Sequence, residues 1–161
     1  MPKTSSAFLR KRVCIFGFAA CFFLIAATTL PAKGTGKNPF EEKILGTWFI
    51  EYDDKDIKGV QIVTFSSDKT CHFKSFFIIS DTKSPSEVDQ KYEIDENRIR
   101  YQVTRVEGIW PFKVGNYIYE SIDKITDTEF IFRDVKGKKR IRQKVSEFQA
   151  WYLWITHTLF K

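Results

Sequence analysis

Hydrophobic and polar residues alternate with a period of two along most of the chain after Gly46. The clearest case is EVDQKYEI, residues 87–94, in which uncharged side chains occupy one face and charged side chains the other. This alternation is typical of a half-buried β-strand, because successive side chains point to opposite faces of a sheet. Turn-forming residues separate the alternating segments, and no helical pattern lies between any two of them. The pattern predicts eight strands, at residues 47–53, 59–66, 70–80, 87–94, 97–106, 116–125, 128–135 and 139–145.

The connections between these strands are short, so neighbouring strands are expected to pair in antiparallel fashion. Tight Asp-containing turns, SDK, DEN and TDT, alternate with the longer DKDIK, DTKSPS and GIWPFKV, and the last connection, KGK, is short. Alternate connections of an up-and-down meander lie at opposite ends, which would leave longer loops at one end only. Eight strands enclose space for side chains or for one small ligand. We therefore predict an all-β fold, an eight-stranded antiparallel up-and-down barrel, with a β-sandwich as the alternative.

The first 32 residues differ from the rest in composition. MPKTSSAFLRKR has four basic residues and no acidic one, VCIFGFAACFFLIAATTL runs for 18 residues without a charge, and small residues follow. This order is that of a secretory signal peptide, and Ala32 suits cleavage. A retained N-terminal membrane anchor is one alternative, because roughly 17–25 apolar residues span a bilayer, and lipidation at Cys21 is another. We assign residues 1–32 to this leader, 33–37 to a linker and 38–161 to the barrel domain, with a helical tail at 146–161.

Removal of the leader changes the charge of the chain. The leader holds four of the 26 basic residues and none of the 20 acidic ones, which leaves 22 basic against 20 acidic residues. This balance gives no reason to expect nucleic-acid binding. Cys14 and Cys21 lie in the leader, so Cys71 is alone in the domain and cannot form an internal disulfide. We interpret Cys71 as a small buried core residue.

Three short motifs stand at defined places relative to these strands. Gly46 and Trp48 open the first strand after the helix-like PFEEKIL, Thr126 and Asp127 lie between the sixth and seventh strands, and Arg142 lies in the eighth strand. In these positions the chain resembles the lipocalins, and more closely short bacterial lipocalin-like domains, over residues 38 to about 150. The family has Gly-x-Trp, a Thr-Asp-x-x-aromatic turn and an arginine packed across the tryptophan. For that last role, Arg140 would serve as well as Arg142.

The resemblance also implies a use for the C-terminal tail. Lipocalins pack a C-terminal helix on the barrel wall, so we expect the apolar stripe of the tail to face the barrel. Leu153, Trp154 and Phe160 lie off this stripe, and contact with a membrane surface is the alternative. The basic segment KGKKRIRQK, residues 136–144, is expected to be a solvated strand face, with anionic lipid or polysaccharide as alternative partners. The stripe consists of Phe148, Trp151, Tyr152, Ile155 and Leu159.

The less charged face of each strand is assigned to the barrel interior. The resulting lining is aromatic with scattered hydroxyl and amide groups, which is usual for a small-molecule pocket, although the same side chains would also fill a narrow closed core. In the sixth strand, Tyr117 and Tyr119 compete with Ile118 and Ile122 for the interior. The other lining residues are Cys71, Phe73, Ser75, Phe77, Ile79, Val88, Gln90, Tyr92, Ile94, Ile99, Tyr101, Val103, Phe130, Phe132, Ile141, Gln143 and Val145.

The connection GIWPFKVGN, residues 108–116, is unusually apolar for a loop. It lies over the predicted mouth, and Pro111 holds Trp110 extended. Trp110 and Phe112 either form a lid on an apolar ligand or fold down and cap a packed barrel, and Arg105 would meet a ligand carboxylate nearby. The candidate ligand-binding residues are Phe73, Phe77, Tyr92, Tyr101, Arg105, Trp110, Phe112, Tyr117, Tyr119 and Phe132.

The chain offers little for catalysis. His72 shares a face with Lys74 and is expected to point outward, His157 lies in the tail, and neither has a companion at catalytic or metal-ligand spacing. No nucleophile motif or Gly-rich phosphate loop occurs in the sequence, and we expect no enzyme activity, metal or cofactor. The sequence thus predicts an exported monomer, periplasmic or secreted, that binds a small apolar or amphipathic molecule in its barrel. The alternative is an envelope-associated module with a packed barrel, whose basic or aromatic surface meets a membrane or a protein partner.

Overall fold

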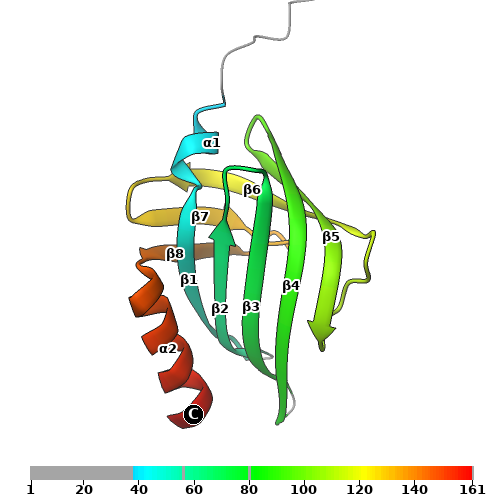
Figure 1. Ribbon diagram of the computed structural model, residues 1–161, viewed down its shortest axis with the longest axis vertical. Coiled ribbons are helices and arrows are strands. Elements are labelled where there is room, and N and C mark those ends of the chain that lie inside the picture. The colour runs from blue at the N-terminus through cyan, green and yellow to red at the C-terminus, as the bar shows by residue number, and fades with distance from the viewer. Residues whose placement is uncertain (1–37, 56, 80, 161) are drawn as a thin grey trace, which may run out of the picture. The chain divides into compact units, whose positions relative to one another are not determined.

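Figure 1 shows the computed structural model of the chain, which describes residues 38–55, 57–79 and 81–160. The predicted leader, its cleavage after Ala32 and lipidation at Cys21 lie outside these residues. The strands are β1 Gly46–Asp53, β2 Lys58–Phe65, β3 Thr70–Ile79, β4 Thr82–Asp95, β5 Arg98–Gly108, β6 Tyr117–Ile125, β7 Glu129–Arg133 and β8 Lys139–Val145. The helices are α1 Phe40–Lys43 and α2 Glu147–Phe160.

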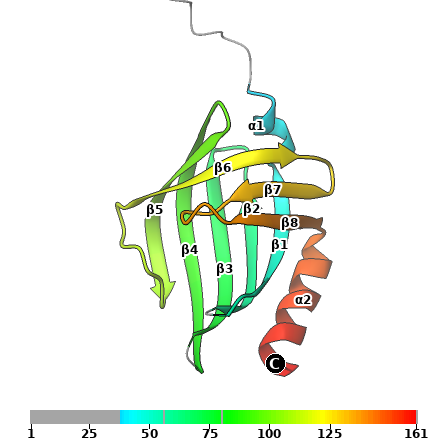
Figure 2. The same cartoon turned by 180° about the vertical axis from the view of Figure 1, so that it is seen from behind.

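The eight strands form one closed antiparallel barrel in the order of the sequence. Closure is completed where β1 pairs with β8, with Trp48 opposite Lys144. In Figure 1 and Figure 2, β1 to β4 run side by side, and β6, β7 and β8 cross them on the other side of the barrel. The prediction of an up-and-down barrel is confirmed, and the sandwich alternative is wrong.

Strand β4 begins at Thr82, well before the predicted residue 87, so DTKSPS is not a long loop. Pro85 lies inside this strand, although proline cannot donate a hydrogen bond to a sheet. Its carbonyl accepts a hydrogen bond from Ile109 N at 3.3 Å. The N and O atoms of one residue in an antiparallel strand point to the same side. The position without an N–H therefore faces the end of β5, and the backbone hydrogen bonds between β4 and β3 are not affected.

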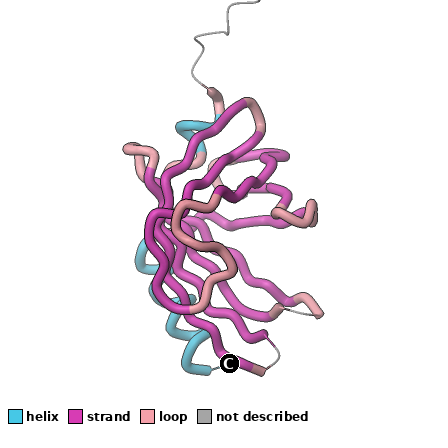
Figure 3. Tube along the Cα trace, turned by 90° about the vertical axis from the view of Figure 1, so that its right-hand side faces the viewer, coloured by secondary structure: helices cyan, strands magenta, loops and turns pink. Residues whose placement is uncertain are grey.

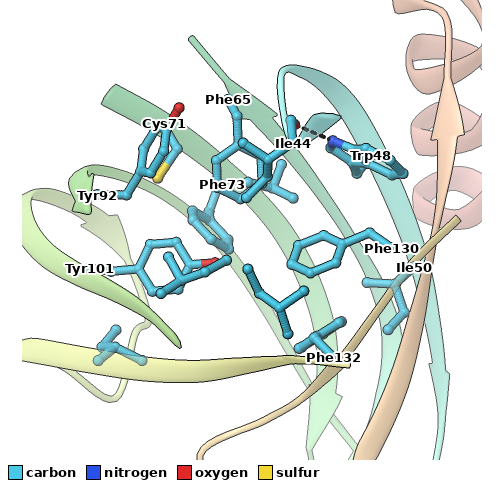
Figure 4. Packing of buried hydrophobic residues seen from close by; sticks show 14 of the residues in the cluster. Ile44, Trp48, Ile50, Phe65, Cys71, Phe73, Tyr92, Tyr101, Phe130 and Phe132 are labelled. Atoms are coloured by element: carbon cyan, nitrogen blue, oxygen red, sulfur yellow. Dashed lines mark hydrogen bonds between the residues drawn. The ribbon is translucent and has the colours of Figure 1, made fainter. Parts of the chain in front are cut away.

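Aromatic rings fill the interior between the base of the barrel and its middle (Figure 4). Phe65 is central to this cluster, with its ring perpendicular to that of Tyr92 at 5.2 Å and close to those of Phe73 and Phe130 at 6.5 and 6.3 Å. Edge-to-face contacts of this kind add about 0.5–1.5 kcal/mol each beyond the burial of area. Cys71 is also in the cluster, and burial raises the pKa of its thiol well above the ordinary value.

Helix α2 lies against the outer face of the barrel at β1, β2 and β8 (Figure 3). It begins with a reciprocal cap, in which Gln149 N donates to Ser146 Oγ at 3.2 Å and Ser146 N donates to Gln149 Oε1 at 2.9 Å. The helix explains why β2 is buried on both faces, since the outward side chains Val60 and Ile62 are 0% and 9% exposed.

The prediction of which side of α2 faces the barrel is wrong. Ala150 is buried, and Trp154 packs edge-on against Phe76 of β3 at 6.3 Å, with Lys74 Nζ 4.8 Å above its ring. The small Ala150 side chain allows a close approach to the sheet, which the bulky stripe would prevent. Phe148, Trp151, Tyr152 and Leu159 instead point away from the barrel and are exposed. Within the described residues, no helix is long and apolar enough to cross a membrane.

Candidate functional site

The base of the barrel is closed around Trp48. The Trp48 side chain is fully buried, its Nε1 donates to Ile44 O at 2.6 Å, and its ring meets Phe130 edge-on at 5.8 Å. Gly46 has φ +106, and a Cβ there would lie 3.2 Å from Lys144 Cε, so the close approach of Lys144 favours glycine. The cation above the Trp48 ring is Lys144, at 5.2 Å, and not Arg142 as the family resemblance implied.

Thr126 and Asp127 form the turn between β6 and β7. Thr126 Oγ1 accepts hydrogen bonds from Glu129 N at 2.9 Å and Thr128 N at 3.3 Å, while the Asp127 side chain is exposed. The threonine therefore closes the turn, which is a structural role.

Arg142 lies inside the barrel. Its side chain is fully buried, and Nη1 and Nη2 each donate to one oxygen of Glu120 on β6 at 2.9 Å. The guanidinium is 3.9 Å from the centre of the Phe132 ring. A paired fork of this kind, stacked on an aromatic ring, suits arginine and not lysine.

The inward position of Arg142 reverses the predicted face of β8. Ile141 is 43% exposed and Gln143 is exposed, so neither lines the interior, and Val145 is only half-buried. The prediction placed the less charged face inward. It is wrong here because Glu120 supplies the opposite charge inside the barrel, so that a buried arginine is paired.

The same carboxylate determines the face of β6. Ile118 and Ile122 are buried, whereas Tyr117 and Tyr119 are 48% and 46% exposed. The two tyrosines therefore do not line the barrel, and the prediction that they do is wrong. Alternation puts Glu120 on the inner face together with Ile118 and Ile122.

A hydrogen-bonded network extends from this ion pair. Tyr101 OH donates to Glu120 Oε2 at 2.7 Å, Arg142 Nη2 donates to Gln61 Oε1 at 3.3 Å, and Gln61 Nε2 donates to Ser75 Oγ at 3.2 Å. Burial, and then the charge of Glu120, raise the pKa of Tyr101 well above its ordinary value, so its proton stays on the hydroxyl. Burial alone would lower the pKa of Arg142, but Glu120 raises it, so Arg142 stays charged.

Arg105 points outward from the barrel. In the pairing of β4 with β5, Asp89 is opposite Arg105 and Gln90 is opposite Val103, so Thr104 is an extra residue. Such a bulge changes the face on which the following side chains lie. Arg105 Nη1 is 2.9 Å from Asp89 Oδ2, and Arg105 also pairs with Glu107. Its predicted inward position is therefore wrong, and its contact with a ligand carboxylate at the rim stays a prediction.

The predicted aromatic residues of β3, β4, β5 and β7 do point inward. Phe73, Tyr92, Tyr101 and Phe132 are buried, and Phe77 is half-buried beside Tyr52 with ring centres 5.3 Å apart. Tyr92 belongs to the base, where its hydroxyl donates to Ser66 O at 3.0 Å.

Residues 109–116 fold back over the mouth as a lid. Trp110 packs against Phe73 at 6.4 Å and against Phe112 at 6.5 Å, while Ile109 and Val114 are exposed. Gly115 N donates to Val103 O at 2.8 Å, which holds the far end of the lid against β5. Trp110 and Phe112 thus fold inward over the barrel, an arrangement that agrees with both alternatives of the sequence analysis.

Four buried polar atoms have no hydrogen-bond partner within the described part of the chain. They are Ser86 Oγ, Gln90 Oε1, Trp110 Nε1 and Arg142 Nε. All four lie around Phe73, since Trp110 and Arg142 contact its ring and Ser86 and Gln90 flank its strand partner Val88 on β4. Leaving a buried polar group unpaired costs about 1–3 kcal/mol, so a cluster of such atoms is a place where a bound water or a ligand group is expected.

Arg140 forms a second ion pair at the mouth. Its guanidinium lies 2.6 Å from Asp54 Oδ2, 3.1 Å from Asp134 Oδ2 and 4.9 Å from the centre of the Tyr52 ring. The hydrogen bonds from Arg140 and Lys138 lower the pKa of Asp54 to about 2. Each arginine inside the barrel is thus already matched by carboxylates.

A groove of about 330 Å³ lies on the outer face of the sheet beside α2. Its walls include Glu51, Asp53, Lys58, Phe76 and His157, and Lys58 Nζ is 3.8 Å from Asp53 Oδ1. His157 Nδ1 is 3.8 Å from Glu51 Oε1, and His72 points outward beside Asp89. The groove is at the lower limit of the volume that ligand pockets have.

No model of a known protein family matches the chain, and no curated protein is significantly similar to it. The relationship to the lipocalins therefore stays a prediction, and the functional argument has to come from the interior of the barrel.

Sequence reasoning missed Gln61 and Ser86, and it placed Arg142 at the base instead of the interior. The one available signal was Glu120. A carboxylate on the inner face of a barrel strand requires an inward cation, and β8 carries the arginines of the basic segment.

Proposed function

We propose that the protein binds a small amphipathic molecule in the half of the barrel beneath the lid, without catalysing a reaction on it. The observation that carries this proposal is the group of unpaired polar atoms around Phe73. A ligand with an apolar chain would replace the contacts of Trp110 and Phe112, and its polar group would pair with Ser86, Gln90 or Arg142 Nε.

The charges of the interior favour a ligand with a neutral polar group. Glu120 takes both terminal nitrogens of Arg142, and Asp54 and Asp134 neutralise Arg140. No uncompensated cation would therefore meet a carboxylate, and desolvating one without a partner is unfavourable. An alcohol, amide or ester on an aliphatic chain fits the donors and acceptors that line the site.

Binding can be tested with dodecanol and dodecanoate as matched probes that differ in the polar group. Native mass spectrometry of the protein purified gently from its host would first show whether a molecule of a few hundred daltons is already bound, since carriers bury most of a ligand of that size. We expect dodecanol to change the fluorescence of Trp110 and to bind more tightly than dodecanoate at neutral pH. Tighter binding of dodecanoate would contradict the proposal that the ligand has a neutral polar group. If neither probe binds, the proposed binding site beneath the lid is wrong.

A pair of matched lid variants tests the location. Trp110→Ser/Phe112→Ser removes the two side chains that point into the barrel, and Ile109→Ser/Val114→Ser removes two exposed side chains of the same lid. We expect the first variant alone to lose dodecanol binding. If both variants bind alike, the groove beside α2 becomes the better candidate.

We also propose that the protein is exported and acts as a monomer in the periplasm or outside the cell, either free or held by its leader. The support is the order of basic, apolar and small residues in positions 1–32. N-terminal sequencing of the protein from its host would give Lys33 if the leader is removed and Met1 or Pro2 if it is retained.

A further inference from the structure

The outer side of α2 carries an apolar stripe, defined by Phe148, Trp151, Tyr152, Ile155 and Leu159. Four of these side chains are well exposed, at 72% for Phe148, 59% for Trp151, 57% for Tyr152 and 72% for Leu159. Phe148 and Trp151 lie against each other with ring centres 6.0 Å apart. No other described element covers this side of the helix, which forms one flank of the molecule in Figure 1, Figure 2 and Figure 3.

The opposite side of α2 is apolar as well and is buried against the barrel. Ala150 and Trp154 pack on the barrel, so the stripe is a second apolar face of the same helix. A surface helix normally has one apolar face and one polar face, and a helix that is apolar all round is covered on both. Among the described residues of α2, the acidic side chain is Glu147 in the first turn and the basic one is His157 in the last turn, which lies beside Glu51 of β1.

The size of the stripe argues against a second copy of this chain as its cover. A large aromatic side chain buries about 150–250 Å², so four side chains exposed to this extent offer roughly 500 Å². A stable interface needs about 800 Å² from each partner. Dimerisation through the stripe alone would fall short of this area.

The composition of the stripe fits the surface of a lipid bilayer. Phenylalanine, tryptophan and leucine on one face are typical of helices that lie in the interfacial plane, at a depth of about 5–10 Å. The ring NH of tryptophan and the hydroxyl of tyrosine can stay hydrated at the level of the headgroups while the rings are buried. We propose that α2 docks the barrel on a lipid bilayer through this stripe.

Docking of this kind depends on apolar contact and only weakly on charge, because the stripe contains no basic residue. It therefore differs from attachment by the basic leader or by the segment at residues 136–144. It is also independent of ligand binding, since the lid and the stripe share no residue.

The test uses the full chain reconstituted with vesicles of phosphatidylcholine brominated on the acyl chains, which quench tryptophan at bilayer depth. Because the leader can hold the chain on vesicles by itself, the readout is quenching of one tryptophan and not binding alone. We expect strong quenching that is mostly lost in Trp151→Phe and kept in Trp154→Phe. Quenching that survives Trp151→Phe unchanged would overturn the proposal.

A second pair of variants separates docking from general surface hydrophobicity. Phe148→Ser/Tyr152→Ser keeps Trp151 as the reporter, and Tyr117→Ser/Tyr119→Ser removes two exposed tyrosines of β6 as the matched control. If the protein purified from its host lacks the leader, we expect the first variant to weaken its partitioning to vesicles by about tenfold. If the leader is retained, we expect the same loss in the quenching of Trp151. The control variant should leave both quantities unchanged. An equal effect of both variants would contradict docking through the stripe. Binding that appears only with phosphatidylglycerol and disappears in high salt would contradict it as well. So would sedimentation that shows a dimer dissociated by Phe148→Ser/Tyr152→Ser without any quenching of Trp151.

Discussion

The guanidinium of Arg142 and the carboxylate of Glu120 meet inside the barrel through two hydrogen bonds of 2.9 Å, and the Arg142 side chain is 1% exposed. The pair joins β8 to β6, which are not neighbours in the barrel. It therefore links the two strands over Phe132 of β7, on the inner wall of the barrel. Its position also divides the barrel into an aromatic base and a mouth half with unpaired polar atoms.

Removing one member of this pair should destabilise the fold strongly. In Arg142→Met, the Glu120 carboxylate keeps the hydrogen bond from Tyr101 but loses its cation, and breaking a buried pair in this way typically costs about 3–5 kcal/mol. Arg142→Met/Glu120→Leu should recover much of that loss, because no unpaired charge remains. Urea unfolding of the three proteins checks this. Equal stability of the single and the double variant would show that the charges are solvated.

Ser86 and Ser75 form a matched pair for testing the unpaired atoms. They lie opposite each other on β4 and β3, but Ser75 Oγ accepts from Gln61 while Ser86 Oγ has no partner among the described residues. We expect Ser75→Ala to lower the free energy of unfolding by about 1 kcal/mol and Ser86→Ala to leave it unchanged or to raise it. Ser86→Ala should also weaken dodecanol binding. A destabilising Ser86→Ala with unchanged binding would mean that its hydroxyl has a structural role.

Asp54 should make stability depend on pH at low values. Its pKa is lowered from 3.8 to about 2 in the folded protein, so the stabilisation it provides is present above about pH 4 and is lost as the pH falls through 2. Asp54→Asn should flatten this part of the stability profile and leave the profile above pH 5 parallel to that of the wild type. Acid unfolding followed by circular dichroism provides the measurement. Asp127→Asn, in an exposed turn, is the control and should not change the shape.

Gly108 should tolerate substitution much less than Gly115 does. Both have positive φ, +82 and +88, but a Cβ at Gly108 would lie 2.2 Å from Pro85 O, whereas one at Gly115 would meet nothing within 4 Å. Gly115→Ala should cost about 1 kcal/mol from the backbone conformation alone, and Gly108→Ala clearly more. Gly108→Ala should also shift Trp110 emission to the red, because the lid begins at this residue. Equal unfolding midpoints for the two variants would show that β4 and β5 can separate at this point.

The strands were predictable because period-two alternation is local and strong. Closure of the barrel followed from their number and from the short connections. The bounds differ mainly at β4, which begins at Thr82 and takes in most of the segment predicted as a loop. The position of Trp48 at the start of β1 was also correct, together with the burial of Phe73, Tyr101 and Phe132.

The errors have a common origin, since alternation shows two faces but not which of them is inside. For β6 and β8 the rule that charge points outward failed, because Glu120 and Arg142 satisfy each other across the interior. The orientation of Arg105 depended on one extra residue, Thr104, which sequence periodicity does not reveal. For α2 the bulky stripe was assigned to the barrel, whereas the side with the small Ala150 packs on the barrel wall.

The contact of Trp48 with Lys144 has a consequence for how the chain folds. The two residues belong to the first and last strands, so almost the whole domain separates them along the sequence. Contacts of this range form late and slowly. Until Val145 has left the ribosome, β1 and β7 are the free edges of an open sheet, the arrangement most prone to pairing with another chain. For the export proposed above, this delay would be useful, because the barrel cannot close on a chain that is still incomplete.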